Sequence, residues 1–428
     1  MCGIAGIVAP QAIRYRNTLQ RMTDALAHRG PDGQGHHIFD NCVLGHRRLA
    51  IVDIDGGRQP MCSTSGHVAV TFNGEIYGYQ DIRCQLTDYP FCTRSDTEVI
   101  LALYERYGEH ALEHLPGMFA FAIWDDSKQE LFCARDRFGE KPFYYAIGHD
   151  GEFIFASEIK GILATGLINP VLDQEAVARY LRRQCVRTDQ SIYANIRALP
   201  PGHCLRYREG QVQMARYWSL PEIENDINPD EAIECFRLLL RNAVRRQLVA
   251  DVPLGAFLSG GLDSSTVCMV ASQMVEDLRT FSFDFEGSHS EVVYARAVAH
   301  AYHTRHVEMA THDVDIAHQL WQMQCIYDEP FGDTSNIPTY LLAREARRHV
   351  KVILTGDGGD ELFGGYEWYK PLLWMEHEGK IGLLHWVGAR ILNRLYRSIG
   401  LPGAAARELR IMGLAYGRQY NSVLAAHH

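Results

Sequence analysis

The sequence predicts two domains of different fold class: an α+β half with antiparallel sheets, followed by an α/β half with a parallel sheet. Short β-rich runs bounded by Gly, Asp and Asn dominate the first half. After about residue 230, strands alternate with helices. Residues 211–229 carry Glu, Asn, Asp and Pro with weak periodicity, which is typical of a linker. We therefore expect domains at 1–210 and 230–428, joined by a linker at 211–229.

The elements of the first half follow from its hydrophobic pattern. Residues 17–27 and 96–107 show helical periodicity. The remaining apolar segments are short, rich in β-branched and aromatic residues, and separated by turn residues. These strand candidates are CGIAGIV, NCVLGHRRLAIVD, HVAVTFNGEIY, FAFAIWD, ELFCARDR, PFYYAI and EFIFAS.

The second half begins with an amphipathic helix predicted over residues 230–248. The apolar run PLGAFL then meets a glycine-rich turn, and a new helix starts at LDSSTVCMVASQMV. TFSFDF, HVEM and VKVILTG follow as strand candidates between helical stretches. This alternation is typical of a parallel sheet covered by helices.

Composition and charge exclude several function classes. The chain has 428 residues, 46% hydrophobic and 22% charged, which are globular proportions. The net charge of -10 argues against a nucleic-acid partner, which usually needs a basic surface. The eleven scattered cysteines and the absence of a basic leader predict reduced thiols and a cytoplasmic protein. The sequence contains no run of about 18 apolar residues, so we expect no membrane span. We interpret residues 381–401 as a surface helix with a basic side.

Cys2 is a candidate nucleophile because it directly follows the initiator methionine. Removal of Met1 would leave a thiol and a free α-amine on one residue. An α-amine with a pKa near 8 can act as the general base for that thiol. A retained Met1 would block this amine. A cysteine at position 2 means little alone, so the interpretation depends on the surrounding motifs.

Those motifs resemble the class II glutamine amidotransferases, in order and spacing, over nearly all of the first 200 residues. The resemblance implies an N-terminal-nucleophile hydrolase sandwich, with two antiparallel sheets between helices, and a glutaminase in which Cys2 attacks glutamine. The matching motifs are MCGIAG, HRGPD, LGHRRLAIVD, FNGEIY, RSDTEVIL, GMFAFAIWD, ARDRFGEKPFYY and FASEIK.

The same resemblance assigns the glutamine-binding residues. Attack on an amide creates a tetrahedral anion, which needs hydrogen-bond donors. Asn73 and Gly74 are expected to supply them from a side-chain amide and a backbone N–H. Arg48 suits the substrate carboxylate as a planar fork. Asp96 and Glu75 suit the substrate ammonium group.

A glycine-rich turn, SGGLDSS at residues 259–265, predicts a phosphate site. It follows an apolar strand and precedes a helix, whose N-terminus directs N–H groups and a positive dipole towards an anion. The chain lacks the G-x-x-x-x-G-K-[ST] pattern of a Walker-type loop. SGGLDSS instead resembles the pyrophosphate loop of the ATP pyrophosphatases, which cleave ATP between the α and β phosphates.

IYDEPFGDTS and LTGDGGDELFGGY extend this resemblance to the synthetase domain of the glutamine-hydrolysing asparagine synthetases. The resemblance implies ATP and Mg²⁺ as cofactors, because ATP usually binds with this oxygen-seeking ion. It places Asp263 and Asp360 at the metal and Asp357 near the activated acceptor. The residues that it assigns to ATP are Leu258, Ser259, Gly260, Gly261, Asp263, Ser264, Phe283, Thr355 and Gly356.

The C-terminal end departs from the family pattern. The family's synthetase domain closes with a basic and acidic stretch and a Pro-Phe-Leu-Asp-like run, which this sequence lacks after Gly365. We therefore expect a synthetase domain that is truncated relative to the family.

The combined hypothesis is a glutamine-dependent amidotransferase that adenylates a carboxylate such as aspartate and amidates it with ammonia from glutamine. Three alternatives stay open. The acceptor could be a sugar acid, a cell-wall peptide or a natural product, because the motifs concern only glutamine and ATP. The chain could be a glutamine or ATP sensor, or a glutaminase alone. The expected partners are these small molecules, and a homodimer is an assembly that the sequence leaves open.

Overall fold

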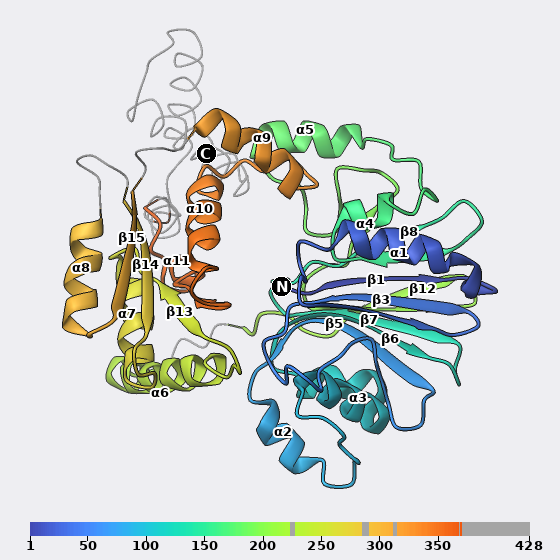
Figure 1. Ribbon diagram of the computed structural model, residues 1–428, viewed down its shortest axis with the longest axis horizontal. Helices are drawn as coiled ribbons and strands as arrows, with labels where there is room; N and C mark the ends of the chain where they lie inside the picture. Colours follow the sequence, from blue (N-terminus) through green and yellow to red (C-terminus); the bar gives the residue numbers. More distant parts are fainter. Residues whose placement is uncertain (223–226, 285–290, 311–314, 368, 370–428) are drawn as a thin grey trace, which may run out of the picture.

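The computed structural model describes residues 1–222, 227–284, 291–310, 315–367 and 369. The described part forms two layered units, coloured blue to green and green to orange in Figure 1. The basic helix predicted at 381–401 and the C-terminal departure from the family lie outside the described residues.

Two six-stranded antiparallel sheets form the N-terminal unit. The first has the order β10-β8-β9-β1-β3-β2, and the second has the order β12-β11-β7-β6-β5-β4. The strands of the first sheet are β1 (Gly3–Val8), β2 (Gly33–Ile38), β3 (Cys42–Arg48), β8 (Tyr144–Ile147), β9 (Phe153–Ala156) and β10 (Arg197–Ala198). Those of the second are β4 (Met61–Cys62), β5 (Val68–Ile76), β6 (Gly117–Asp125), β7 (Glu130–Arg135), β11 (His203–Arg208) and β12 (Gln211–Arg216).

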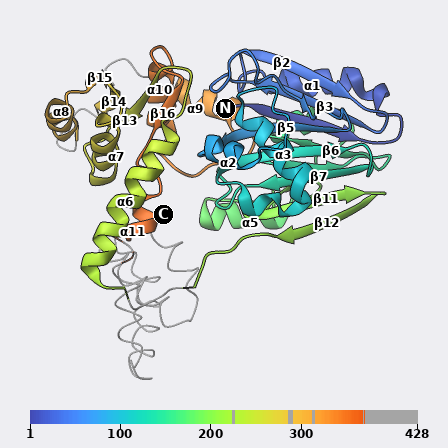
Figure 2. The ribbon, with the colours of Figure 1, turned by 90° about the horizontal axis from the view of Figure 1, so that it is seen from below.

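Helices cover the outer faces of both sheets, as Figures 1 and 2 show. Helix α1 (Arg16–Ala25) and helix α4 (Ile159–Leu163) pack on the first sheet, and α3 (Asp96–Tyr107) packs on the second. The other helices of this unit are η1 (Ala12–Tyr15), α2 (Tyr79–Gln85), η2 (Gly108–His114) and α5 (Gln174–Arg183). This helix–sheet–sheet–helix arrangement confirms the predicted sandwich.

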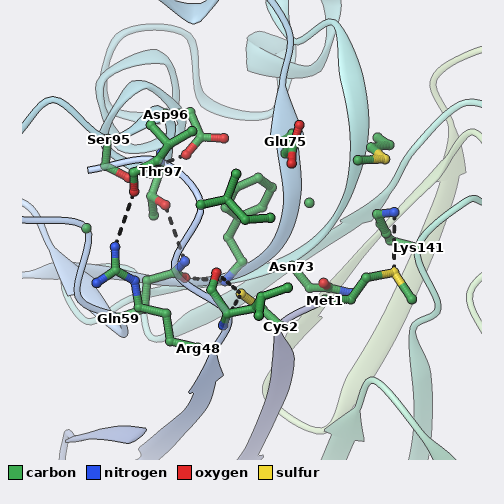
Figure 3. Close-up of a pocket in the computed structure, with 17 residues that line it drawn as sticks. Met1, Cys2, Arg48, Gln59, Asn73, Glu75, Ser95, Asp96, Thr97 and Lys141 are labelled. Atoms are coloured by element: carbon green, nitrogen blue, oxygen red, sulfur yellow. Dashed lines mark hydrogen bonds between the residues drawn. The ribbon is translucent and has the colours of Figure 1, made fainter. Parts of the chain in front are cut away.

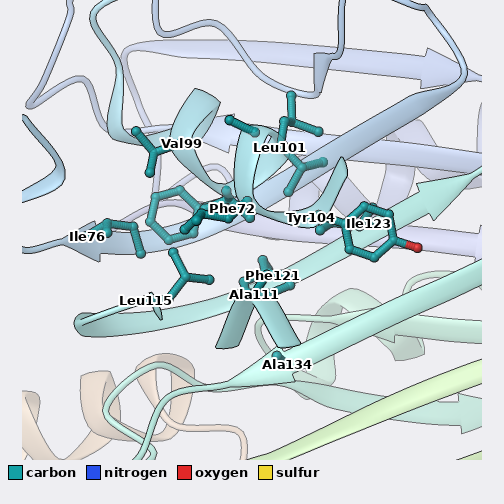
Figure 4. Packing of buried hydrophobic residues seen from close by; sticks show 14 of the residues in the cluster. Phe72, Ile76, Val99, Leu101, Tyr104, Ala111, Leu115, Phe121, Ile123 and Ala134 are labelled. Atoms are coloured by element: carbon teal, nitrogen blue, oxygen red, sulfur yellow. The ribbon is translucent and has the colours of Figure 1, made fainter. Parts of the chain in front are cut away.

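Three apolar layers stabilise the sandwich. One lies between α1 and the first sheet, one between the two sheets, and one between α3 and the second sheet. Figure 4 shows the third layer, where Phe72 and Phe121 of the sheet pack among Val99, Leu101 and Tyr104 of the helix. Sheets covered on both faces bury every side chain of their central strands. All six residues of β1 are accordingly buried.

A four-stranded parallel sheet with the order β15-β14-β13-β16 forms the C-terminal unit and confirms the predicted α/β class. Its strands are β13 (Leu254–Phe257), β14 (Arg279–Asp284), β15 (Arg305–Ala310) and β16 (Val352–Leu354). Its helices are α6 (Pro229–Gln247), α7 (Leu262–Ser272), α8 (Val292–Ala301), α9 (Ile316–Ile326), α10 (Asn336–Ala346) and α11 (Gly359–Phe363). Residues of α6, α7 and α8 bury one face of this sheet, and α10 packs against Phe281 on the other.

The structure differs from the sequence prediction at the linker. Gln211–Arg216 forms β12, an edge strand that pairs with β11, so the N-terminal sheet extends into the segment predicted as linker. All six residues of β12 are exposed. Its first four residues, QVQM, do alternate polar and apolar residues, but this run has only two large apolar side chains and leads directly into the polar, proline-containing segment that follows.

Direct contacts join the two units at several places. The backbone N–H of Asp53 donates to Asp251 Oδ2 at 2.7 Å, and Asp251 N–H donates to the Ile51 carbonyl at 2.9 Å. Lys351 Nζ donates to Asp32 Oδ2 at 2.9 Å. Within the described part of the chain, no helix is long and apolar enough to cross a membrane.

Candidate active site

Cys2 lines a pocket in the N-terminal unit, one residue before β1 (Figure 3). The Leu49 N–H points at its thiol, with 3.4 Å between nitrogen and Sγ. Burial raises the pKa of Cys2, which this N–H partly offsets. A buried thiol with a raised pKa needs a base to become nucleophilic.

Met1 occupies the edge of the same pocket. Its sulfur accepts a hydrogen bond from Lys141 Nζ at 3.4 Å, a contact drawn in Figure 3. Burial lowers the pKa of the Met1 amine to about 6, so this amine is mostly neutral at pH 7. The chain terminus therefore lies where a free amine could accept a proton.

The structure brings all five predicted glutamine-site residues into this pocket, together with others that the sequence did not single out. Leu49, Ile51 and Val52 belong to the LGHRRLAIVD motif, but they contribute backbone groups and apolar walls to the pocket rather than polar side chains. The full lining is Met1, Cys2, Arg48, Leu49, Ile51, Val52, Gly57, Gln59, Phe72, Asn73, Gly74, Glu75, Ser95, Asp96, Thr97, Met118 and Lys141.

Asn73 carries an unpaired amide. Its side chain is buried, and neither its Nδ2 nor its Oδ1 has a hydrogen-bond partner among the described residues. Leaving a buried polar group unpaired costs about 1–3 kcal/mol. An amide held in this state beside Cys2 is suited to bind an anion that forms during a reaction.

Gly74 must be glycine for steric reasons. A Cβ at this position would lie 2.1 Å from the Met118 carbonyl oxygen, because β5 and β6 pair closely there. Its φ of 159° is also one that residues with side chains rarely adopt. The backbone can therefore take its position beside Cys2 only without a side chain.

Two acids line the pocket and have perturbed protonation. Burial raises the pKa of Asp96 to about 6, even though the Ile76 N–H donates to its Oδ2 at 3.0 Å. Burial and the neighbouring Asp96 raise the pKa of Glu75 to about 7. A cationic group bound between these carboxylates would favour their charged forms.

Arg48 has a role that the sequence did not predict. Its Nη1 donates to the Ile54 carbonyl at 2.6 Å, and its Nη2 donates to the carbonyls of Asp53 at 2.6 Å and Val52 at 3.2 Å. The guanidinium thereby fixes the loop that carries Leu49 and Val52. It also lines the pocket, so the predicted contact with a substrate carboxylate stays a prediction.

The predicted phosphate loop lies at the carboxyl end of β13, and residues 355–360 lie at the carboxyl end of β16. The strand order β15-β14-β13-β16 changes direction at β13. Parallel sheets bind ligands in the crevice outside such a switch point. Gly260 has a φ of 86°, and a Cβ there would lie 2.8 Å from the backbone of Glu291 and Ala295.

The two loops touch each other through glycines. A Cβ on Gly356 would lie 2.7 Å from Ser264 N, and a Cβ on Gly359 would lie 2.4 Å from the Asp263 carboxyl carbon. This close approach brings the loop of Asp360 against Asp263. Mg²⁺ usually binds one or two carboxylates together with substrate phosphates, so the metal site expected at Asp263 and Asp360 stays a prediction.

The other predicted ATP residues surround these loops. Ser259 Oγ and Ser264 Oγ are 2.9 Å apart, and Thr355 Oγ1 donates to Asp357 Oδ2 at 2.9 Å. Phe283 is half-buried near the carboxyl end of β14. The Leu258 side chain is buried in the core, so a contact with adenosine would come from its backbone.

A cavity of about 390 Å³ lies between the two units. Met1 and Leu49 line both this cavity and the Cys2 pocket. Thr355, from the loop after β16, lines its other side. The complete lining is Met1, His28, Arg29, Pro31, Asp32, Leu49, Phe257, Ala343, Ala346, Arg347, Val350, Lys351, Ile353 and Thr355.

Comparison with known proteins decides the family. Residues 1–218 match the family model of a glutamine amidotransferase domain, and residues 235–422 match that of asparagine synthase. A protein of Methanocaldococcus jannaschii described as putative asparagine synthetase (glutamine-hydrolyzing) 2 is 39% identical over 392 residues, which cover 86% of this chain and 76% of that protein. The chain belongs to the glutamine-hydrolysing asparagine synthetase family. The asparagine synthetase (glutamine-hydrolyzing) 1 of Bacillus subtilis is 35% identical over 87% of this chain.

The chain spans 60% of the length of this Bacillus synthetase and 64% of a second one from the same organism. Among solved structures, one described as the allosteric regulatory enzyme of purine biosynthesis covers 78% of this chain at 16% identity, with a TM-score of 0.41.

We predict that Gly74→Ala removes glutaminase activity without unfolding the protein. The new methyl group would push β5 away from Met118 and displace the backbone N–H beside Cys2. Loss of one oxyanion donor typically lowers kcat about 10²–10³-fold. Gly33→Ala is the matched control, since its Cβ meets only Arg48 Cβ at 3.7 Å. Equal glutamate release by both variants in a coupled assay would contradict the steric assignment.

Proposed function

We propose that this chain hydrolyses glutamine at Cys2 and uses the ammonia to convert an ATP-activated carboxylate, aspartate, into an amide. The observation that carries this proposal is the shared cavity. Met1 and Leu49 beside the nucleophile and Thr355 beside the phosphate loop line the same space. The names of the relatives favour aspartate as the acceptor.

In the glutaminase step, the thiolate of Cys2 attacks the side-chain amide carbon of glutamine. Asn73 Nδ2 and the Gly74 N–H bind the oxyanion, and ammonia leaves as the carbonyl re-forms. Water then hydrolyses the thioester and releases glutamate. Arg48 binds the substrate carboxylate, and Glu75 and Asp96 bind its ammonium group.

Removal of Met1 would provide the base for this step. The new α-amine of Cys2 would lie in the region where burial lowers the pKa of the Met1 amine to about 6. An amine that is mostly neutral at pH 7 can take the thiol proton and later pass it to the leaving ammonia.

In the synthetase unit, the acceptor carboxylate attacks the α-phosphorus of ATP and pyrophosphate leaves. Ammonia then attacks the acyl carbon and AMP leaves. The loop at Ser259–Ser264 and the N-terminus of α7 bind the phosphates, Thr355 and Gly356 lie beside the nucleotide, and Asp357 lies beside the acceptor. Asp263 and Asp360 would hold Mg²⁺, which neutralises phosphate charge when bound.

The interdomain cavity would carry ammonia between the sites. Arg29, Arg347 and Lys351 line it and would repel ammonium, so the neutral and nucleophilic form is favoured inside.

We assign residues 1–216 to the glutaminase unit and residues from 229 onward to the synthetase unit.

We expect Cys2→Ala and Asp263→Asn to have opposite effects. Cys2→Ala should abolish AMP formation supported by glutamine but retain that supported by ammonium chloride, because only the ammonia source is lost. Asp263→Asn should abolish both while glutamine hydrolysis continues. AMP and glutamate are measured by chromatography. Loss of both AMP activities in Cys2→Ala, with its fold intact, would contradict a two-site mechanism.

Glutamine binding should weaken as the pH falls from 8 to 6. The pKa of Glu75 is raised to about 7, so this carboxylate loses its charge, and its attraction for the substrate ammonium, over this interval. A group of pKa 7 is roughly 90% ionised at pH 8 and 10% at pH 6, which limits the contribution of Glu75 to the increase in Kd to about tenfold, and Asp96, with a pKa of about 6, adds at most about twofold. Calorimetry on Cys2→Ala measures Kd without turnover.

The control for this pH effect is Cys2→Ala combined with Glu75→Gln. Its Kd should be high and should change no more than about twofold between the two pH values, because the Glu75 carboxyl group is absent and only Asp96, with a pKa of about 6, still titrates. A Kd that falls on acidification, or an unchanged slope in the Glu75→Gln background, would contradict the assignment.

A further inference from the structure

A buried arginine connects the nucleophile to a carboxylate outside the pocket. Arg29 Nε donates to the Cys2 carbonyl at 2.8 Å, and its Nη1 donates to Glu158 Oε1 at 2.7 Å. The side chains of Arg29 and Glu158 are only 8% and 15% exposed. Burial alone would raise the pKa of Glu158, but His28 and Arg29 hold this pKa at about 2. Glu158 is therefore charged at neutral pH and fixes the arginine that holds Cys2.

Glu158 in turn lies next to a lysine that contacts the other domain. Lys160 Nζ is 3.0 Å from Glu158 Oε2 and 3.2 Å from Asp328 Oδ1, which belongs to the segment between α9 and α10. The same ammonium group donates to the carbonyls of Cys325 and Ile326 at the end of α9, at 3.2 and 3.1 Å. Cations are favourable at the C-terminus of a helix.

Asp328 also caps a helix of the glutaminase unit. The N-cap residue of α4, Glu158, makes no side-chain capping bond of its own. Asp328 Oδ2 instead accepts a hydrogen bond from the Lys160 backbone N–H at 2.9 Å, in the first turn of α4. A carboxylate there satisfies a free helix donor. The start of α4 is thus completed by a residue of the synthetase unit.

The segment before α4 contacts the nucleophile strand as well. Ser157 Oγ accepts from the Ile4 N–H at 3.0 Å, and the Ser157 N–H donates to the Ile4 carbonyl at 2.9 Å. Residues 157–160 therefore hold the start of β1 on one side and Asp328 on the other.

We propose that Asp328 is a positioning residue for the glutaminase nucleophile, acting across the domain interface through Lys160, Glu158 and Arg29 on the Cys2 carbonyl. This inference rests on the proposed glutaminase function of Cys2. The segment of Asp328 continues through α10 to β16 and the Thr355 loop. A change at the nucleotide site that moves this segment would alter the orientation of Cys2, which would make glutamine cleavage depend on the state of the synthetase unit.

The neighbouring interdomain contact provides a matched control. Tyr144 OH donates to Glu329 Oε2 at 3.1 Å, one residue from Asp328. Within the described part of the chain, this hydroxyl forms no hydrogen bond with Arg29, Glu158 or Lys160. Tyr144→Phe therefore removes an interdomain hydrogen bond from the same docking segment and leaves the proposed connection to Cys2 intact.

The test compares Asp328→Ala, Lys160→Met, their double variant and Tyr144→Phe in the full chain. We expect Asp328→Ala to lower kcat for glutamine hydrolysis roughly tenfold with little change in KM, because displacing a reacting group slows chemistry without removing substrate contacts. AMP formation supported by ammonium chloride should stay within twofold of the wild type. Lys160→Met should behave alike, and the double variant should lose no more than the worse single variant. Tyr144→Phe should retain full glutaminase activity.

Equal glutaminase loss in Asp328→Ala and Tyr144→Phe, or multiplied losses in the double variant, would overturn the proposal. Thermal unfolding of each variant separates misfolding from misplacement, and Asp328→Asn, which keeps the shape and a capping oxygen, should recover part of kcat. The rate of Cys2 alkylation by iodoacetamide gives a readout that does not require turnover. A wild-type chain that releases no glutamate would refute the proposed function. The alkylation rate would still test the positioning role, because this role requires the rate of Cys2 alkylation in Asp328→Ala to differ at least threefold from that of the wild type.

Discussion

The whole design depends on holding the first residues of the chain rigid. Chain termini usually fray unless they are tied into the fold. Here β1 starts at Gly3, pairs with β3 on one side and with β9 on the other, and is buried along its full length. Cys2 thus extends from a central strand rather than from a loose end. The Leu49 N–H and the Arg29 guanidinium then fix its thiol and its carbonyl.

The same constraint bears on why the two proposed sites lie at a common interface. Cys2 lies at the N-terminal end of the central strand β1, on the side of its domain that faces the C-terminal unit. The C-terminal unit faces this end of the strand across a partly open cavity that Met1, Leu49 and Thr355 line together. The contacts of Asp328 and Glu329 with Lys160, Tyr144 and the Ile192 N–H fix one side of the arrangement, and Asp251 and Lys351 fix another.

Much of this could be predicted from sequence, and the exceptions have physical reasons. Helix α3 has its predicted bounds of 96–107 because Ser95 caps it through the Thr97 N–H and Gly108 follows its last residue. Strand β12 was missed because its alternation of polar and apolar residues is short and adjoins a segment with the composition of a linker. The sequence motifs predicted Asn73 and Glu75 as residues of the pocket. The contact of the Leu49 N–H with the thiol could not be predicted, because every residue type except proline has a backbone N–H. The Arg29–Glu158–Lys160–Asp328 connection was not predicted either. Its members lie in the motifs HRGPD, FASEIK and IYDEPFGDTS, but contacts between segments this far apart in the chain cannot be derived from residue type.

The central claim is that one chain transfers the amide nitrogen of glutamine to aspartate through an adenylated intermediate. The most direct measurement supplies ATP, Mg²⁺ and glutamine labelled with ¹⁵N at the amide, with aspartate present or absent, and follows AMP, pyrophosphate and labelled asparagine. We expect AMP and pyrophosphate in equal amounts only with aspartate, and the label in the product amide even in excess unlabelled ammonium. Glutamate release without aspartate-dependent AMP would contradict the claim, and would point to another acceptor or to a glutaminase alone.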